Sequence, residues 1–151
     1  MNKVRFQVIV ILCLVLSACT ASKTKYYLTS QLDRYEYVSV VNDDTYHIPA
    51  ELREYEAQLF DAVESSRLQL VSDNGIHELN PQQQSGLLLV RYNVNQTDDQ
   101  TVVTANFIDY TTGRLIASCR GAYGSGLDRA GDLKEAIKRV QRQISVTFPR
   151  K

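Results

Sequence analysis

The sequence is poor in the residue types that most often mark a metal centre. It contains only three cysteines and two histidines among its 151 residues. The two histidines, His47 and His77, lie far apart in the chain, and neither belongs to a metal-ligand spacing. His77 falls in a segment predicted to be a loop, where a solvated or locally hydrogen-bonded side chain is expected. The sequence therefore predicts no bound metal.

The chain also lacks an excess of either charge. It has 17 basic and 17 acidic residues, for a formal net charge of zero. A domain that binds nucleic acid is usually strongly basic, so this class of function is excluded. Apolar residues make up 44% of the chain, which is enough for a folded core and argues against intrinsic disorder.

Catalytic residue sets are missing as well, since no Ser-His-Asp or paired-carboxylate arrangement has support from spacing. The glycine-rich stretch GAYGSG at 121–126 follows a predicted strand. No Lys-Ser/Thr pair follows these glycines, so we expect a flexible connection instead of a phosphate-binding loop. Asp109 precedes YTTG, and we expect it to form a turn by accepting backbone N–H groups. The sequence predicts that the protein is not an enzyme.

Long hydrophobic runs are absent too. The apolar run from Phe6 to Leu16 is shorter than the roughly 20 residues that a membrane-spanning helix needs. It follows Lys3 and Arg5, and this order of charge and apolar run is typical of a signal peptide.

The run ends in LSAC at 16–19, which resembles the lipobox of bacterial lipoproteins. The resemblance implies cleavage before Cys19 and covalent lipid on its thiol and on the freed amine, palmitate included. An ordinary secretory signal with an incidental Cys19 is the alternative, but an A-x-A-like cleavage site is missing. Each buried methylene contributes about 0.8 kcal/mol to anchoring. The residue after Cys19 is Thr20 and not aspartate, a pattern that resembles the sorting signal of outer-membrane lipoproteins. We therefore expect a protein that is lipid-anchored in the outer membrane and faces the periplasm.

Removal of residues 1–18 leaves 151 − 18 = 133 residues, with 15 basic against 17 acidic side chains. We expect residues 1–18 to be the signal peptide, 19–30 a lipidated tether that leads into an edge strand, and 31–149 a single domain. Because Cys13 lies in the signal and Cys19 carries lipid, Cys119 has no partner for a disulfide. We expect it to be a small, buried core residue on a strand, since a lone thiol in an oxidising periplasm is protected by burial.

Hydrophobic periodicity places the helices and strands. Apolar residues at steps of three and four predict helices over 49–66 and 132–148. The two stripes are Leu52, Tyr55, Leu59 and Val63, then Leu133, Ile137, Val140, Ile144 and Phe148. Asp132 is the expected N-cap of the second helix, with Glu135 at a capping-box spacing. Alternating, β-branched and aromatic residues predict strands over 35–41, 68–71, 87–94, 101–110 and 115–123.

The resulting order, β-α-β-β-β-β-α, predicts an α+β fold. Consecutive strands joined by hairpins favour a mainly antiparallel sheet of four to five strands. Each helix has a single apolar stripe, so both are expected to pack on one face of that sheet.

Three stretches carry a family resemblance: LDRYEY at 32–37, GLLLVRY at 86–92 and DYTTGRL at 109–115. With the closing amphipathic helix, they resemble a family of bacterial lipoprotein domains of unknown function, similar to the small α+β domains of curli-secretion and Tol-associated periplasmic proteins. Gly86 replaces the aspartate usual in that family, and the common tryptophan after the hairpin is missing. The resemblance implies a fold and no catalytic residues.

Basic side chains on the second helix are the most suggestive polar feature, namely Lys134, Lys138, Arg139 and Arg142, followed by Arg150 and Lys151. They form either a plain solvated face or a surface that docks an acidic partner, anionic lipid or peptidoglycan carboxylates.

These observations leave three hypotheses for function. The first is a non-enzymatic accessory or adaptor domain of a cell-envelope assembly, with an envelope protein as partner and the covalent lipid on Cys19 in place of any cofactor. The second is a carrier or chaperone that holds a lipid or glycan between helices and sheet. The third, with least support, is a hydrolase that uses Cys119, which would need a nearby base.

Overall fold

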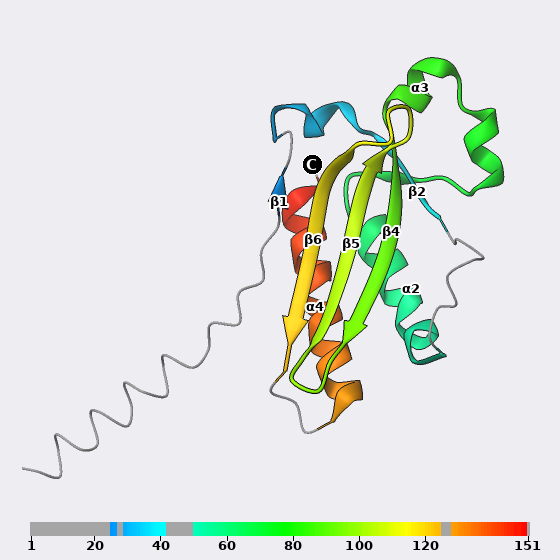
Figure 1. Cartoon of the computed structure of the whole chain (residues 1–151). Helices are drawn as coiled ribbons and strands as arrows, with labels where there is room; N and C mark the ends of the chain where they lie inside the picture. Colours follow the sequence, from blue (N-terminus) through cyan, green and yellow to red (C-terminus); the bar gives the residue numbers. More distant parts are fainter. Residues whose placement is uncertain (1–24, 27–28, 42–49, 125–127, 151) are drawn as a thin grey trace, which may run out of the picture.

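The computed structural model describes residues 25–26, 29–41, 50–124 and 128–150. It has an α+β fold, as predicted (Figure 1). The elements in chain order are β1 (Lys25–Tyr26), the 3-10 helix η1 (Thr29–Arg34), β2 (Tyr37–Val40), α2 (Ala50–Glu64), β3 (Gln69–Leu70), the 3-10 helix η2 (Asn74–Glu78), α3 (Pro81–Ser85), β4 (Leu87–Gln96), β5 (Thr101–Asp109), β6 (Leu115–Tyr123) and α4 (Arg129–Thr147).

The sheet has six strands in the order β1-β6-β5-β4-β2-β3, one more than the upper end of the expected range. Strands β4, β5 and β6 form an antiparallel meander, and β1 extends it antiparallel to β6. Strand β2, however, is parallel to both β3 and β4. Side chains alternate between the two faces of a strand in parallel and in antiparallel sheets alike, so the sequence pattern could not distinguish parallel from antiparallel pairing.

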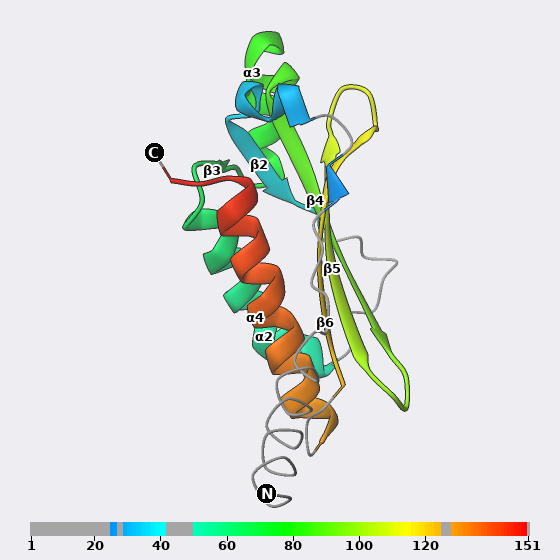
Figure 2. The same cartoon turned by 90° about the vertical axis from the view of Figure 1, so that its left-hand side faces the viewer.

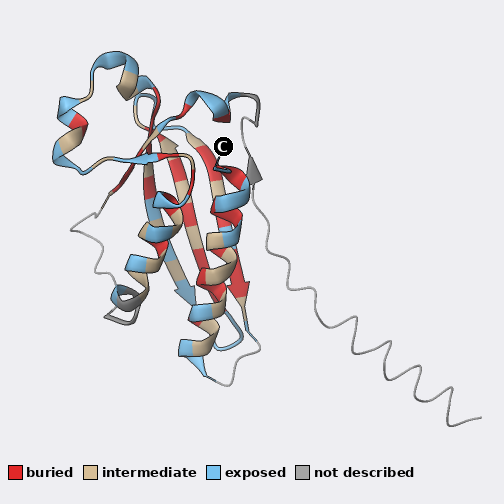
Figure 3. Cartoon of the chain, turned by 180° about the vertical axis from the view of Figure 1, so that it is seen from behind, coloured by how far each residue is buried: buried red, intermediate tan, exposed pale blue. Residues whose placement is uncertain are grey.

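Helices α2 and α4 cover one face of the sheet and lie side by side (Figure 2). Their predicted apolar stripes point inward: Leu59 and Val63 on α2, and Ile137 and Ile144 on α4, are fully buried. Figure 3 shows the same division, with buried positions on the side of each helix that meets the sheet.

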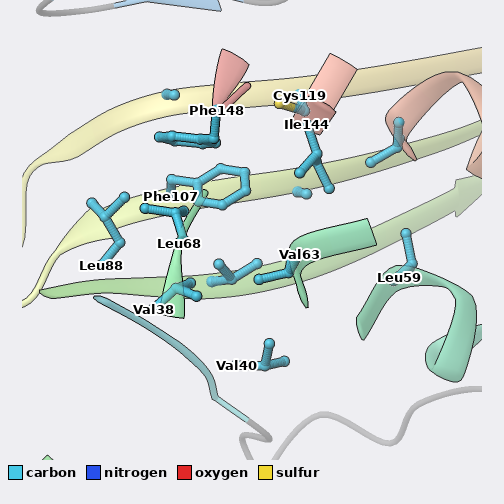
Figure 4. Packing of buried hydrophobic residues seen from close by; sticks show 14 of the residues in the cluster. Val38, Val40, Leu59, Val63, Leu68, Leu88, Phe107, Cys119, Ile144 and Phe148 are labelled. Carbon is cyan, nitrogen blue, oxygen red and sulfur yellow. The ribbon is translucent and has the colours of Figure 1, made fainter. Parts of the chain in front are cut away.

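The core between the layers is filled by apolar side chains (Figure 4). Phe107 of β5 and Phe148, directly after α4, pack with ring centroids 4.7 Å apart. At Gly121 of β6, an added Cβ atom would lie 2.0 Å from the carbonyl oxygen of Ala136. Only glycine therefore allows β6 and α4 to pack at this separation.

Several local expectations need correction. The polar stretch at 81–86, expected as a loop, contains α3, which the side chain of Asn80 caps by accepting from Gln83 N at 2.9 Å. His77 lies in η2 instead of a loop, and it is exposed. Strand β1 falls inside the range expected to be a tether and is the edge strand to which that tether leads.

The start of α4 also differs from the expectation. Asp128, not Asp132, is its N-cap, because the Asp128 side chain accepts the backbone N–H of Gly131 at 2.6 Å. The predicted hairpin turn after β5 is confirmed, since Gly113 has a φ of 66°, a conformation that glycine adopts without steric cost. In the described part of the chain, no helix has the length and apolar character needed to cross a membrane.

Candidate functional site

A groove runs along the outer surface of the helical layer, between α2 and α4. Its volume is about 360 Å³, and its lining residues are Asp61, Ala62, Ser65, Lys138, Gln141, Arg142 and Ser145. Two of the four cations predicted to form a docking surface, Lys138 and Arg142, thus lie in one groove, one helical turn apart.

The packing of the helices fixes this groove. The inner side of α4 is held by buried residues such as Ile137 and Val140, so residues on its opposite side must face solvent. Gln141 Nε2 donates a hydrogen bond to the carbonyl oxygen of Gln58 at 2.8 Å, which ties α4 to α2 across the groove. Lys134, one turn before Lys138, is exposed on the same helix.

The Glu135 carboxyl lies among basic side chains on this surface. It forms an ion pair with Lys138, and the side chains of these two residues are 36% and 42% exposed, respectively. The hydrogen bond from Lys138 lowers the pKa of the Glu135 carboxyl below its ordinary value, and the charges of Lys138, Arg142 and Arg139 lower it further. An acidic group from another molecule would meet the same favourable field.

Arg139 does not belong to the groove, although the sequence pattern grouped it with the other cations. Its Nη1 donates a hydrogen bond to the carbonyl oxygen of Ala122 at 2.7 Å. Its guanidinium carbon lies 4.9 Å from the centre of the Tyr123 ring, a cation–π contact. Arg139 therefore faces the end of β6 and helps to fasten α4 to the sheet.

A second group of charged side chains surrounds the buried carboxylate of Asp109, where β5 meets the turn after it. Asp109 is 1% exposed, and its Oδ1 accepts the backbone N–H groups of Thr111 at 3.0 Å and Thr112 at 2.8 Å. The prediction of a turn-forming aspartate is therefore confirmed. The second oxygen, Oδ2, accepts the Tyr35 hydroxyl at 2.7 Å and also the guanidinium of Arg34.

These surroundings shift two pKa values. Burial alone would raise the pKa of Asp109, but hydrogen bonds from Tyr35, Thr112 and Arg34 outweigh it, and the net pKa lies below its ordinary value. Burial, together with the hydrogen bond to the Asp109 carboxylate, raises the pKa of Tyr35 to about 12. Asp109 is thus a charged acceptor and Tyr35 a protonated donor at neutral pH.

Arg67 was not singled out by the sequence. It lies just after α2, and its Nη1 donates to the carbonyl oxygen of Tyr35 at 2.7 Å. Its Nη2 donates to the carbonyl oxygen of Leu32, and its guanidinium lies over the Phe148 ring at 5.7 Å. One arginine therefore joins two places that are distant in the chain, the segment Leu32–Tyr35 at the end of η1 and Phe148 after α4.

The remaining candidate residues that the structure describes do not join either charged group. Cys119 is fully buried on β6, as expected, and its Sγ lies 3.7 Å from Thr147 Oγ1. Cys19 and His47 lie outside the described residues. Among the residues that the structure describes, no group of three or more His, Cys, Asp or Glu side chains could hold a metal ion.

The hypothesis of a carrier places a ligand between helices and sheet. In the described part of the chain that interface holds buried side chains from both layers, including Val63, Phe107 and Ile144. The carrier hypothesis stays a prediction.

Comparison with protein-family models and with curated proteins finds no match. Among solved structures, the chain is similar to two PelC dodecamers from Paraburkholderia phytofirmans. The first, a single-residue variant, has 16% sequence identity and a TM-score of 0.49 over 86% of this chain and 100% of that chain. The second has 14% identity and a TM-score of 0.48 over 87% of this chain and 100% of that chain.

Proposed function

We propose that this protein is a lipid-anchored accessory or adaptor domain of a bacterial cell-envelope assembly, without catalytic activity. In this proposal it faces the periplasm from the outer membrane and docks an acidic segment of a protein partner in the groove between α2 and α4. The observation that carries the proposal is the pair of neighbouring cations, Lys138 and Arg142, in a groove of about 360 Å³.

The anchor is supported by the lipobox-like sequence that ends at Cys19. Strand β1 begins at Lys25, so only residues 20–24 lie between Cys19 and the first residue that the structure describes. Even fully extended, this segment spans only about 20 Å. A lipid on Cys19 would therefore hold the domain close to the bilayer, where an adaptor meets the membrane-proximal part of an assembly.

The charge of the groove supports an acidic partner. Of its lining residues, Lys138 and Arg142 are basic and Asp61 alone is acidic. Lys138 is already paired with Glu135 at the surface, but exposed ion pairs of this kind are weak and exchange readily. A carboxylate from a partner can therefore compete for Lys138 while it also binds Arg142 in a bidentate manner.

The test of docking uses the full-length lipoprotein in intact envelopes. A photo-crosslinking amino acid replaces Ser145, which is exposed in the groove, and in a control strain it replaces Arg91, which is exposed on the opposite face of the sheet. We expect a discrete crosslinked protein from position 145 only. Crosslinks from both positions, or from neither, would contradict the groove as a docking site, and crosslinks to lipid alone would assign it to the membrane.

Charge reversal gives a matched comparison. The double variant Lys138→Glu with Arg142→Glu removes the positive groove, whereas Arg91→Glu with Arg114→Glu makes the same change in net charge at exposed positions elsewhere. We expect at least a tenfold loss of the crosslinked product in the first variant and no loss in the second. Equal losses would indicate a general effect of charge.

The anchor is tested separately. Cys19→Ala should abolish incorporation of radiolabelled palmitate and release the protein from the outer-membrane fraction of a density gradient. Palmitate labelling that persists in this variant would disprove the assignment of Cys19.

A further inference from the structure

A second pocket lies where η1 and β2 meet α3, three elements whose positions Figure 1 shows. Its volume is about 290 Å³. The side chains that matter for its chemistry are those of Arg34, Glu36, Tyr37, Asn80, Gln82 and Gln83. This pocket is separate from the groove between α2 and α4, so a ligand in it is independent of the partner proposed for the groove.

Hydrogen bonds to the fold fix the position of the Arg34 guanidinium. Its Nη2 donates to the Tyr35 hydroxyl at 2.8 Å and to the buried carboxylate of Asp109. The Arg34 side chain is nevertheless 48% exposed, and its Nη1 and Nε make no hydrogen bond to the described residues. These N–H groups are donors at the wall of the pocket in a side chain whose orientation is already fixed, so binding costs little further ordering.

The opposite wall is equally ordered. Gln83 exchanges hydrogen bonds with Asn80 through both backbone N–H groups, and its Nε2 donates to the Tyr37 hydroxyl at 3.2 Å. This network fixes one amide group and one aromatic ring at the pocket. Gln82, by contrast, is exposed and makes no side-chain hydrogen bond to the described residues, so its amide offers both a donor and an acceptor.

The charges of the pocket select the ligand. The positive charge of Arg34 is matched by Asp109, which is buried directly behind it. The carboxylate of Glu36, exposed at the pocket, then remains without a matching cation among the lining residues. A negatively charged ligand would be repelled, whereas an uncharged ligand with many hydroxyl groups meets donors and acceptors on both walls.

We propose that this pocket binds an uncharged saccharide of one or two rings. Planar amide and guanidinium groups suit vicinal hydroxyls, and Tyr37 supplies an aromatic ring beside them. Most pockets for drug-sized ligands are lined mainly by apolar side chains and have volumes of about 300–1,000 Å³. This pocket is at the lower limit of that range and polar, which excludes a lipid chain and limits the size of the sugar.

Binding is measured on the full-length lipoprotein in a zwitterionic detergent that carries no sugar. Saturation-transfer NMR detects binding, and a titration gives the dissociation constant of each of three probes. Cellobiose and di-N-acetylchitobiose are uncharged, and cellobiouronic acid carries a carboxylate. We expect at least one uncharged disaccharide to bind. The anionic disaccharide should bind at least tenfold more weakly than cellobiose, and Glu36→Gln should reduce that difference.

Two glutamine variants locate the site. Gln82→Ala removes an exposed amide from the pocket and should weaken disaccharide binding about fivefold, the effect of one lost hydrogen bond. Gln69→Ala, at an exposed position on the edge strand β3, should leave the affinity unchanged. The proposal is overturned if neither uncharged disaccharide binds, if Gln82→Ala binds as well as the wild type, or if the anionic disaccharide binds more tightly than cellobiose.

Discussion

The two charged regions of the molecule, around Asp109 and along the outer face of α4, differ in how deeply their side chains are buried and in how many hydrogen bonds they make within the fold. Asp109 is 1% exposed and accepts hydrogen bonds from four different residues, Arg34, Tyr35, Thr111 and Thr112. Lys138 on the outer face of α4 is 42% exposed and, among the described residues, pairs only with Glu135. The same types of residue therefore hold the fold together around Asp109 and remain exposed on the outer face of α4.

The largest effect is expected from Asp109→Asn. The amide keeps the shape of the side chain but removes the charge that Arg34 and Tyr35 face, and it leaves donors opposed to donors in a buried place. Because Arg34 is half-exposed, we expect a loss of roughly 2 to 3 kcal/mol in the free energy of unfolding, below the full cost of breaking a buried ion pair. Urea unfolding followed by circular dichroism measures it.

A matched control for that variant is Asp98→Asn. Asp98 pairs with Arg129 at 3.1 Å, but its side chain is 95% exposed. We expect its free energy of unfolding to stay within about 0.5 kcal/mol of the wild type. If both aspartate variants lose the same stability, burial is not what distinguishes the two regions.

The same carboxylate should make the stability depend on pH. The pKa of Asp109 is lower in the folded state than its ordinary value, so its stabilisation is complete above the unfolded-state pKa of about 3.9 and is lost as the pH falls through the folded-state value. The difference in unfolding free energy between wild type and Asp109→Asn should therefore narrow below about pH 4. A difference that stays constant from pH 7 to pH 3 would show that the charge of Asp109 is not the cause.

Tyr35→Phe should have a smaller effect. It deletes only the hydroxyl that donates to Asp109 at 2.7 Å, and we expect a loss of about 1 to 1.5 kcal/mol in the free energy of unfolding. Tyr110→Phe, at a half-buried position beside Asp109 in the chain, serves as the control and should change little. Because the chain has no tryptophan, the circular dichroism signal is preferable to fluorescence.

The smallest effects on the free energy of unfolding are expected for two neighbouring cations on α4, Arg139 and Lys138. Arg139→Met loses the hydrogen bond to Ala122 and the contact with the Tyr123 ring, and we expect a loss of about 1 kcal/mol in the free energy of unfolding. Lys138→Met should leave this free energy within about 0.5 kcal/mol of the wild type. The reverse order would place Lys138 in the fold and return Arg139 to the docking surface.

Local patterns predicted the elements well. The three-and-four spacing of Leu133, Ile137, Val140 and Ile144 depends on helix geometry alone, and all four are buried. The turn at Gly113 was equally local, since it needs one residue with positive φ. The N-cap was predicted wrongly, although Asp128 and Asp132 are both good N-cap residues: the Asp128 side chain accepts the backbone N–H of Gly131, so α4 begins one turn earlier than expected.

The site was predicted only in part. Residues that share one face of one helix, such as Lys138 and Arg142, could be grouped from their spacing. Arg139 was misplaced because the sequence does not show that the end of β6 approaches that side of α4. The cluster around Asp109 was missed for the same reason, since Arg34 and Asp109 are 75 residues apart in the chain.

The sequence by itself determined the α+β class, the inward stripes of α2 and α4, the buried Cys119 and the turn at Asp109, because each depends on side chains within a few residues of one another. Only the tertiary structure decided the parallel pairing of β2, the contacts of Arg67 and the two pockets. These depend on segments brought together by the packing of a whole core, and a one-dimensional pattern contains no direct record of which segments meet.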